Sequence, residues 1–181
     1  RNARDSGEFV YPALPSDGPA IDVLFDYLRA VGLLNAGQYK EAVGRYNVVL
    51  RIHPDLYLAY HGRALAYYNE DLFDLALDEI DEALRSAQAG NYSRIQATAL
   101  MQRGMVQRAL GAYTESIASS SRGLELARRN LDQRLIAGCT EGLGNAYRLL
   151  GDTSKAEVLL NEALLEAEGS GQKYISAIYN I

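Results

Sequence analysis

The chain has 181 residues, 48% of them hydrophobic, and a formal net charge of −5. The acidic balance argues against a nucleic-acid-binding surface, which is usually basic, and no apolar run approaches the roughly 20 residues of a membrane-spanning helix. The only cysteine, Cys139, excludes an intrachain disulfide. Because the chain starts at Arg1 rather than Met, we expect the native N-terminus to be missing. The compartment is undetermined, with the cytoplasm as the default.

The first 19 residues differ from the rest of the chain. Residues 1–19 contain three of the four prolines and show no helical period. This composition predicts an extended N-terminal arm or linker. From residue 20 onward, apolar residues recur every three to four positions, and no segment alternates with period two. The sequence after residue 20 therefore predicts short helices joined by tight turns.

Four segments of this helical region share one frame. Gly37, Asp71, Gly111 and Gly151 occupy the same place in each segment, with spacings of 34, 40 and 40 residues. A small residue follows five positions later in each case, namely Ala42, Ala76, Ser116 and Ala156. Internal periods of this size are typical of stacked helix pairs, in which each pair needs its neighbours to bury its apolar face. We expect the turn glycines to adopt the left-handed conformation that ends a helix, and the small residues to allow close helix packing.

The repeated frame resembles the tetratricopeptide (TPR) family over residues 21–181. The second unit matches the family pattern at Tyr60, Ala64, Tyr67, Ala76, Ile80 and Ala83, and the fourth at Leu143, Gly144, Tyr147, Ala156, Leu160 and Ala163. The first unit matches at Ala30, Tyr39, Ala42, Tyr46 and Pro54, and the third at Gly104, Tyr113 and Gly123. The third unit departs from the pattern at Ser116 and Ser120, where the family prefers Ala and an aromatic residue. The resemblance implies an all-α fold, a right-handed superhelical α-solenoid of TPR helix pairs.

We place the units at residues 21–55, 56–92, 93–131 and 132–170, within a solenoid spanning 20–181. The 40-residue spacing resembles the longer-helix variants of the family. Residues 171–181 look like the first helix of a partial fifth repeat. Because a solenoid seldom ends on an unsealed apolar face, we expect a fragment of a longer protein.

The resemblance also implies a peptide-binding groove lined by the first helix of each pair. Both methionines fall on it, and thioether side chains suit adaptable peptide surfaces. The alternative is that most of these side chains pack between neighbouring helices. The candidate groove residues are Tyr27, Val31, Asn35, His61, Leu65, Tyr68, Asn69, Met101, Met105, Arg108, Glu141, Asn145 and Arg148.

A basic segment interrupts the acidic chain. Residues 85–134 contain eight arginines and three acidic residues. This Arg belt could steer a partner that carries acidic residues, or it could be a solvated surface that balances its acidic neighbours. It comprises Arg85, Arg94, Arg103, Arg108, Arg122, Arg128, Arg129 and Arg134.

No motif in the sequence indicates catalysis. The hydroxyl-rich segment at 116–123 has no paired base. His53 and His61 lack Cys or carboxylate neighbours at metal-ligand spacing. We therefore expect no catalytic residues, no metal site and no cofactor.

The sequence favours a non-catalytic scaffold that binds a partner peptide or helix in its groove. The alternative is a regulatory or sensor TPR module of a larger enzyme or transcription factor. Self-association through the open C-terminal end is a further possibility. The arm, with Phe9, Val10 and Tyr11, could also occupy the groove in place of a ligand.

Overall fold

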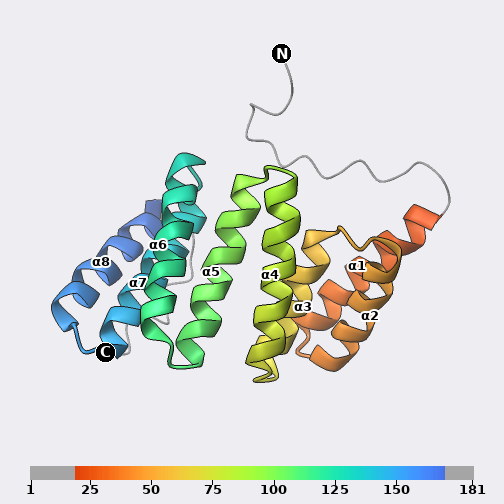
Figure 1. The fold of residues 1–181 in the computed structure, drawn as a ribbon, viewed down its shortest axis with the longest axis horizontal. Coiled ribbons are helices and arrows are strands. Elements are labelled where there is room, and N and C mark those ends of the chain that lie inside the picture. The colour runs from red at the N-terminus through yellow and green to blue at the C-terminus, as the bar shows by residue number, and fades with distance from the viewer. Residues whose placement is uncertain (1–18, 170–181) are drawn as a thin grey trace, which may run out of the picture.

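The computed structural model describes residues 19–169, which form eight α-helices and no strand (Figure 1). The predicted partial fifth repeat and the arm up to residue 18 lie outside the described residues. None of the described helices is both long and apolar enough to cross a membrane. The helices are α1 (Pro19–Asn35), α2 (Tyr39–Ile52), α3 (Tyr57–Asn69), α4 (Phe73–Ala89), α5 (Ser93–Ala109), α6 (Tyr113–Arg129), α7 (Gln133–Leu149) and α8 (Thr153–Gly169).

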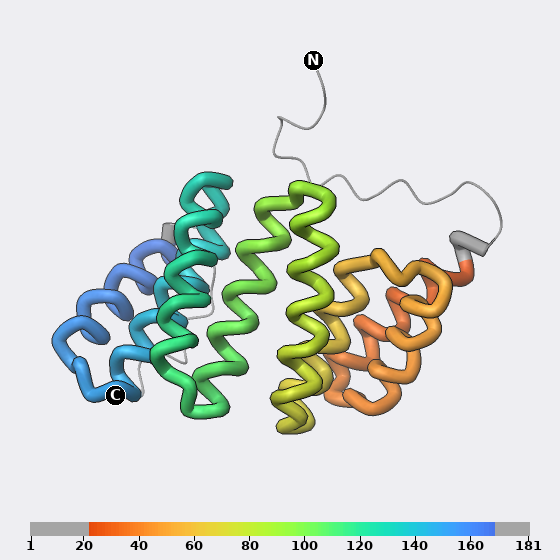
Figure 2. The backbone as a smooth tube through the Cα atoms, viewed as in Figure 1, coloured from red at the N-terminus to blue at the C-terminus, as the bar shows by residue number. Residues whose placement is uncertain are grey.

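The helices follow one another across the molecule, from α1 at one end to α8 at the other (Figure 2). Each packs against the next in sequence, and α1 also packs against α3, as α5 does against α7. Contacts are therefore made between near neighbours along the chain, which is the arrangement of a solenoid. The expected all-α solenoid is confirmed.

Left-handed residues end the first helix of every pair. Gly37, Asp71, Gly111 and Gly151 have φ between 57° and 85°. In each of these turns, the N–H of the next residue bonds to the carbonyl five positions earlier, as from Ala112 to Gln107 at 2.8 Å. This bond satisfies a carbonyl that the helix end leaves free.

The difference between 34- and 40-residue spacing follows from helix length. Helices α4 to α8 each have 17 residues and are separated by three, whereas α2 and α3 have 14 and 13. The α2–α3 connection contains Pro54, whose ring cannot continue a helix. The remaining connections between pairs use Asn91 and Leu131 in the left-handed region, at φ 54°.

Small residues at helix crossings form the tightest part of the core. Ala42 and Ala76 are fully buried, and Ala156 is 3% exposed. Ser116 fills the same place in the third unit, where its buried hydroxyl donates a hydrogen bond to the Gly104 carbonyl at 2.7 Å. The bond removes the cost of burying a hydroxyl, which explains how the third unit tolerates a serine there.

Candidate functional site

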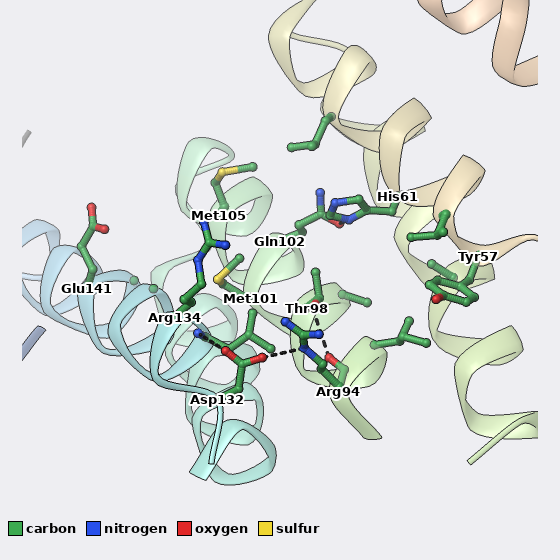
Figure 3. A pocket seen from close by; sticks show the side chains of 18 of the residues that line it. Tyr57, His61, Arg94, Thr98, Met101, Gln102, Met105, Asp132, Arg134 and Glu141 are labelled. Carbon is green, nitrogen blue, oxygen red and sulfur yellow. Dashed lines mark hydrogen bonds and ion pairs between the residues drawn. The ribbon is translucent and has the colours of Figure 1, made fainter. Parts of the chain in front are cut away.

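The first helices of three successive pairs enclose a cavity of about 680 Å³. Side chains from α3, α5 and α7 line this central cavity, together with Ala83 of α4. Its walls are largely apolar, with Leu58 and Leu65 on α3 and Met101 and Met105 on α5. Figure 3 shows the two methionines on one side of the opening and His61 on the other.

The cavity exists because α5 lies close to α7 but not to α3. Gly138 and Gly142 give α7 a flat surface, and a Cβ at Gly138 would be only 2.7 Å from Met101 Sδ. Among the described helices, α3 and α5 do not form a packed pair. A side-chain hydrogen bond links them instead, between His61 and Gln102. Glycine on α7 thus allows α5 and α7 to approach closely, whereas α3 and α5 meet through the side chains of His61 and Gln102.

The His61–Gln102 pair forms one polar part of the cavity lining. His61 Nδ1 lies 2.6 Å from Gln102 Oε1, and because an amide oxygen only accepts, the neutral imidazole carries its proton on Nδ1. Burial lowers the pKa of His61, and the hydrogen bond to Gln102 opposes part of this effect. Gln102 is 3% exposed, and its Nε2 has no hydrogen-bond partner within the described residues. The pair therefore satisfies only part of its hydrogen-bonding capacity.

Charged side chains line the opening toward α7. Arg94 Nε lies 2.6 Å from Asp132 Oδ2. Asp132 also accepts a hydrogen bond from the Leu135 amide at 3.2 Å, so one carboxylate caps α7 and holds an arginine of α5. Arg134 of α7 lines the same cavity, as the close-up shows (Figure 3). Arg108 reaches from α5 toward the Gly142 carbonyl at 3.5 Å.

The structure brings together six of the thirteen candidate groove residues. They span three helices and line the central cavity: His61, Leu65, Met101, Met105, Arg108 and Glu141. The other seven do not line it: Tyr27, Val31, Asn35, Tyr68, Asn69, Asn145 and Arg148. Their binding role stays a prediction.

Several of those seven have other packing partners. The Tyr27 ring lies 6.2 Å from that of Tyr46, and Tyr68 lies 5.7 Å from Phe73. Val31 packs against the core of the first pair. Asn69 Nδ2 donates to its own helix, to the Leu65 carbonyl at 2.7 Å. The contacts of Tyr27, Val31 and Tyr68 agree with the alternative that these side chains pack between helices, whereas Asn69 is exposed and bonds to its own helix.

The candidate groove residues left out several other residues that line the cavity, and four of these show which signals were missed. Ile95 and Gln102 lie on α5, while Asp132 and Arg134 lie at the start of α7. Helical spacing offers a signal for Gln102, because it lies three residues before Met105 and therefore on the same side of α5. Asp132 follows the last residue of a turn and precedes a helix, which is the usual place of a capping aspartate.

The Arg belt is not one continuous surface. Arg94, Arg108 and Arg134 line the central cavity, whereas Arg85, Arg103 and Arg122 line a separate hollow between α4, α5 and α6. The other two form ion pairs elsewhere, Arg128 with Glu162 at 2.9 Å and Arg129 with Glu125 at 2.6 Å. Any attraction of an acidic partner to the cavity depends on the first three.

Residues 19–169 contain no group of three or more His, Cys, Asp or Glu side chains that could hold a metal ion. Cys139 is fully buried, and burial raises the pKa of its thiol to about 12, with a smaller contribution from Asp132. Since the thiolate is the nucleophilic form, this cysteine is a packing residue.

Residues 95–164 match the family model for the tetratricopeptide repeat. A search of curated proteins found no significant match. Solved structures with the same fold include BtubC (BKLC) from P. vanneervenii, at 17% identity and a TM-score of 0.74, covering 88% of this chain and 68% of that one.

Two MamA structures are also similar. The MamA RS-1 ArsTM double mutant has 17% identity and a TM-score of 0.63, covering 82% of this chain and 77% of that one. MamA MSR-1 C2 has 18% identity and a TM-score of 0.59, and the match covers 85% of this chain and 82% of that one. At this level of identity, the likeness establishes the fold.

Proposed function

We propose that this chain, a tetratricopeptide-repeat protein, is a non-catalytic scaffold that holds a peptide segment or helix of a partner protein in its central cavity. The observation that carries the proposal is the cavity itself, where apolar and polar side chains from α3, α5 and α7 converge. Its volume of about 680 Å³ lies within the usual range for ligand sites. A segment placed there would contact three helix pairs at once.

The chemistry of the lining favours a peptide with apolar side chains. Met101, Met105 and Leu65 are half-buried, so an entering side chain can cover the area that they leave exposed. Methionine side chains adapt to different shapes because they are unbranched and polarizable. Burial of this apolar surface would drive association.

Charge at the opening would orient the segment. Arg108 and Arg134 line the cavity, and neither forms an ion pair with a carboxylate of the described residues. If the partner has an acidic residue beside its apolar anchor, that residue could form an ion pair with Arg108 or Arg134. Such pairs contribute mainly to association rate and to orientation.

The test compares two triple variants of the full chain. The cavity variant is Met105→Ala/Arg108→Ala/Glu141→Ala, at three half-buried lining positions. The control is Asn35→Ala/Asn69→Ala/Arg148→Ala, at three exposed positions of the predicted groove that do not line the cavity. Peptides are selected from a displayed random library on the parent chain, and their affinities are then measured by calorimetry.

We expect the cavity variant to lose about tenfold or more in affinity, since the few contacts that dominate binding cluster at the centre of an interface and truncating even one of them costs about 2 kcal/mol. The control should bind within about twofold of the parent. Circular dichroism must show equal helicity in all three proteins. Equal binding by both variants, or greater loss in the control, would contradict binding in the cavity.

A further inference from the structure

A second hollow lies on the outer side of α5, away from the central cavity. It has a volume of about 270 Å³ and is formed by α4, α5 and α6. Arg103 of α5 lines it, about half a helical turn from the residues that face the cavity. Arg85 of α4 and Arg122 of α6 complete a set of three arginines, one from each helix.

The preceding repeat shows how an arginine at this position is normally satisfied. Arg63, forty residues before Arg103, makes a two-pronged ion pair with Glu79: Nε donates to Oε2 at 2.8 Å and Nη2 to Oε1 at 2.9 Å. Both side chains are mostly buried, at 16% and 13% exposure. Glu82 lies close enough to contribute to the raised pKa of Glu79, after the larger effect of burial. Arg63 therefore has two carboxylates in its surroundings.

The third repeat lacks both of these carboxylates. Forty residues after Glu79 and Glu82, the chain has Ser119 and Arg122. The Ser119 hydroxyl donates to Gln107 Oε1 at 2.7 Å and cannot neutralise a guanidinium. One neutral and one basic residue thus replace the two acids, and the carboxylate that Arg103 contacts is Asp81 instead, where Arg63 contacts the amide of Asn47.

The remaining partners leave this cationic cluster incompletely satisfied. Arg103 pairs with Asp81 at 3.2 Å, but its Nε is buried without a hydrogen-bond acceptor. Arg85 pairs with Glu82. Arg122 has no ion pair with any carboxylate of residues 19–169. Among the residues that the structure describes, Asp81 is the only acidic side chain lining the hollow. An anion there would supply the charge that Glu79 and Glu82 supply in the second repeat.

We propose that this outer hollow binds a phosphate group. A phosphate dianion offers several acceptor oxygens, and guanidinium groups bind phosphate with two parallel hydrogen bonds. Arg103 and Arg122 supply the principal contacts, and Arg85 and the Gln88 amide lie at the edge of the same hollow. The ligand is either inorganic phosphate or the phosphoryl group of a phosphorylated peptide, because both present the same chemistry to the arginines.

The test uses the full chain and two variants of equal charge. Arg122→Glu restores the residue type found at position 82, whereas Arg129→Glu alters an exposed arginine that does not line the hollow. Both substitutions lower the net charge by the same amount, so general electrostatic effects cancel. Thermal unfolding is followed in inorganic phosphate and in sodium chloride of equal ionic strength, because a ligand of the folded state raises the melting temperature.

We expect phosphate to raise the melting temperature of the parent and of Arg129→Glu more than chloride does. Arg122→Glu should weaken phosphate binding about tenfold or more, since it removes a charge-assisted contact and adds a repulsive one. The site would be overturned if phosphate and chloride raised the melting temperature of the parent equally. It would also be overturned if both variants lost the stabilisation by phosphate to the same extent. Calorimetry then shows whether the bound phosphate group belongs to a peptide or is the free ion. It compares the peptide acetyl-Gly-phosphoSer-Gly-amide with its unphosphorylated form and with inorganic phosphate. Tighter binding of the phosphopeptide than of inorganic phosphate identifies a peptide ligand, and the reverse identifies the free ion.

Discussion

The phenol ring of Tyr46 on α2 lies directly against the backbone of Gly62 on α3. A Cβ at position 62 would overlap two carbons of the ring and its hydroxyl oxygen. Tyr46 is 1% exposed and packs in the core of the first pair, so its ring has no space to move into. Glycine at position 62 thus sets the distance between the first and second helix pairs.

We expect Gly62→Ala to destabilise the protein by about 1–3 kcal/mol, the usual cost of overpacking a core. Gly44→Ala is the matched control, because Gly44 is also helical but its Cβ would meet nothing within 4 Å. The control should gain about 0.5–1 kcal/mol from the better helix propensity of alanine. Urea unfolding followed by circular dichroism measures both changes. Similar effects of the two substitutions would contradict the proposed clash.

Leu131 carries a backbone strain that a glycine would relieve. It has φ 54° in the turn between α6 and α7, and its side chain is 83% exposed. A left-handed conformation costs a residue with a Cβ about 1–2 kcal/mol, and the exposed side chain recovers little of this by packing. We expect Leu131→Gly to raise the free energy of unfolding by about 0.5–1 kcal/mol after the entropy of glycine is counted.

The reverse substitution at an equivalent turn provides the comparison. Gly111→Leu, at φ 77°, should destabilise the protein by about 1–2 kcal/mol. Melting temperatures of both variants give the result. Destabilisation by Leu131→Gly would show that the leucine side chain contributes packing that outweighs the strain.

The repeat frame was readable from the sequence because local chemistry repeats with it. Gly37, Gly111 and Gly151 mark helix ends by a conformation that glycine adopts readily. Leu131 gives no such signal, since leucine rarely adopts a positive φ, and only the regular succession of 17-residue helices places it in a turn. Where neighbouring units fix the geometry, a residue can occupy a position that its own preference disfavours.

The cavity was only partly predictable, because it depends on the distances between helices. Position in the repeat identified Met105 and Arg108, but it also selected Tyr27 and Tyr68, which pack on other aromatic rings. The contact across the gap between α3 and α5 is made by residues far apart in sequence, His61 and Gln102. Periodicity identifies the face of a helix but does not give the spacing between two faces.

The thiol of Cys139 should be unreactive in the folded protein. Its side chain is fully buried and its pKa is raised to about 12 by burial, so little thiolate exists at neutral pH. We expect no reaction with an aromatic disulfide reagent at pH 8 within minutes, and prompt reaction of one thiol per chain in 8 M urea, far above the usual unfolding midpoint of a small domain. Rapid reaction without denaturant would show that α7 opens locally.

His61 should make the stability of the fold depend on pH. Burial lowers its pKa in the folded state below the ordinary value of 6.5. Between these two pKa values the unfolded chain binds a proton that the folded chain does not, so the free energy of unfolding falls as the pH falls below 6.5. The contribution of neutral, buried His61 to the free energy of unfolding is fully present above pH 6.5. It is lost progressively as the pH falls toward the lowered pKa.

His61→Gln removes the titration and keeps a polar side chain near Gln102. The parent should lose stability between pH 6.5 and pH 5 more steeply than the variant, by up to about 1.4 kcal/mol per pH unit. Urea unfolding at several pH values measures the two slopes, and His53→Gln controls for the loss of a histidine from the unfolded chain. Parallel slopes for parent and His61→Gln would mean that the imidazole accepts its proton within the fold, and that the link between α3 and α5 is open to water.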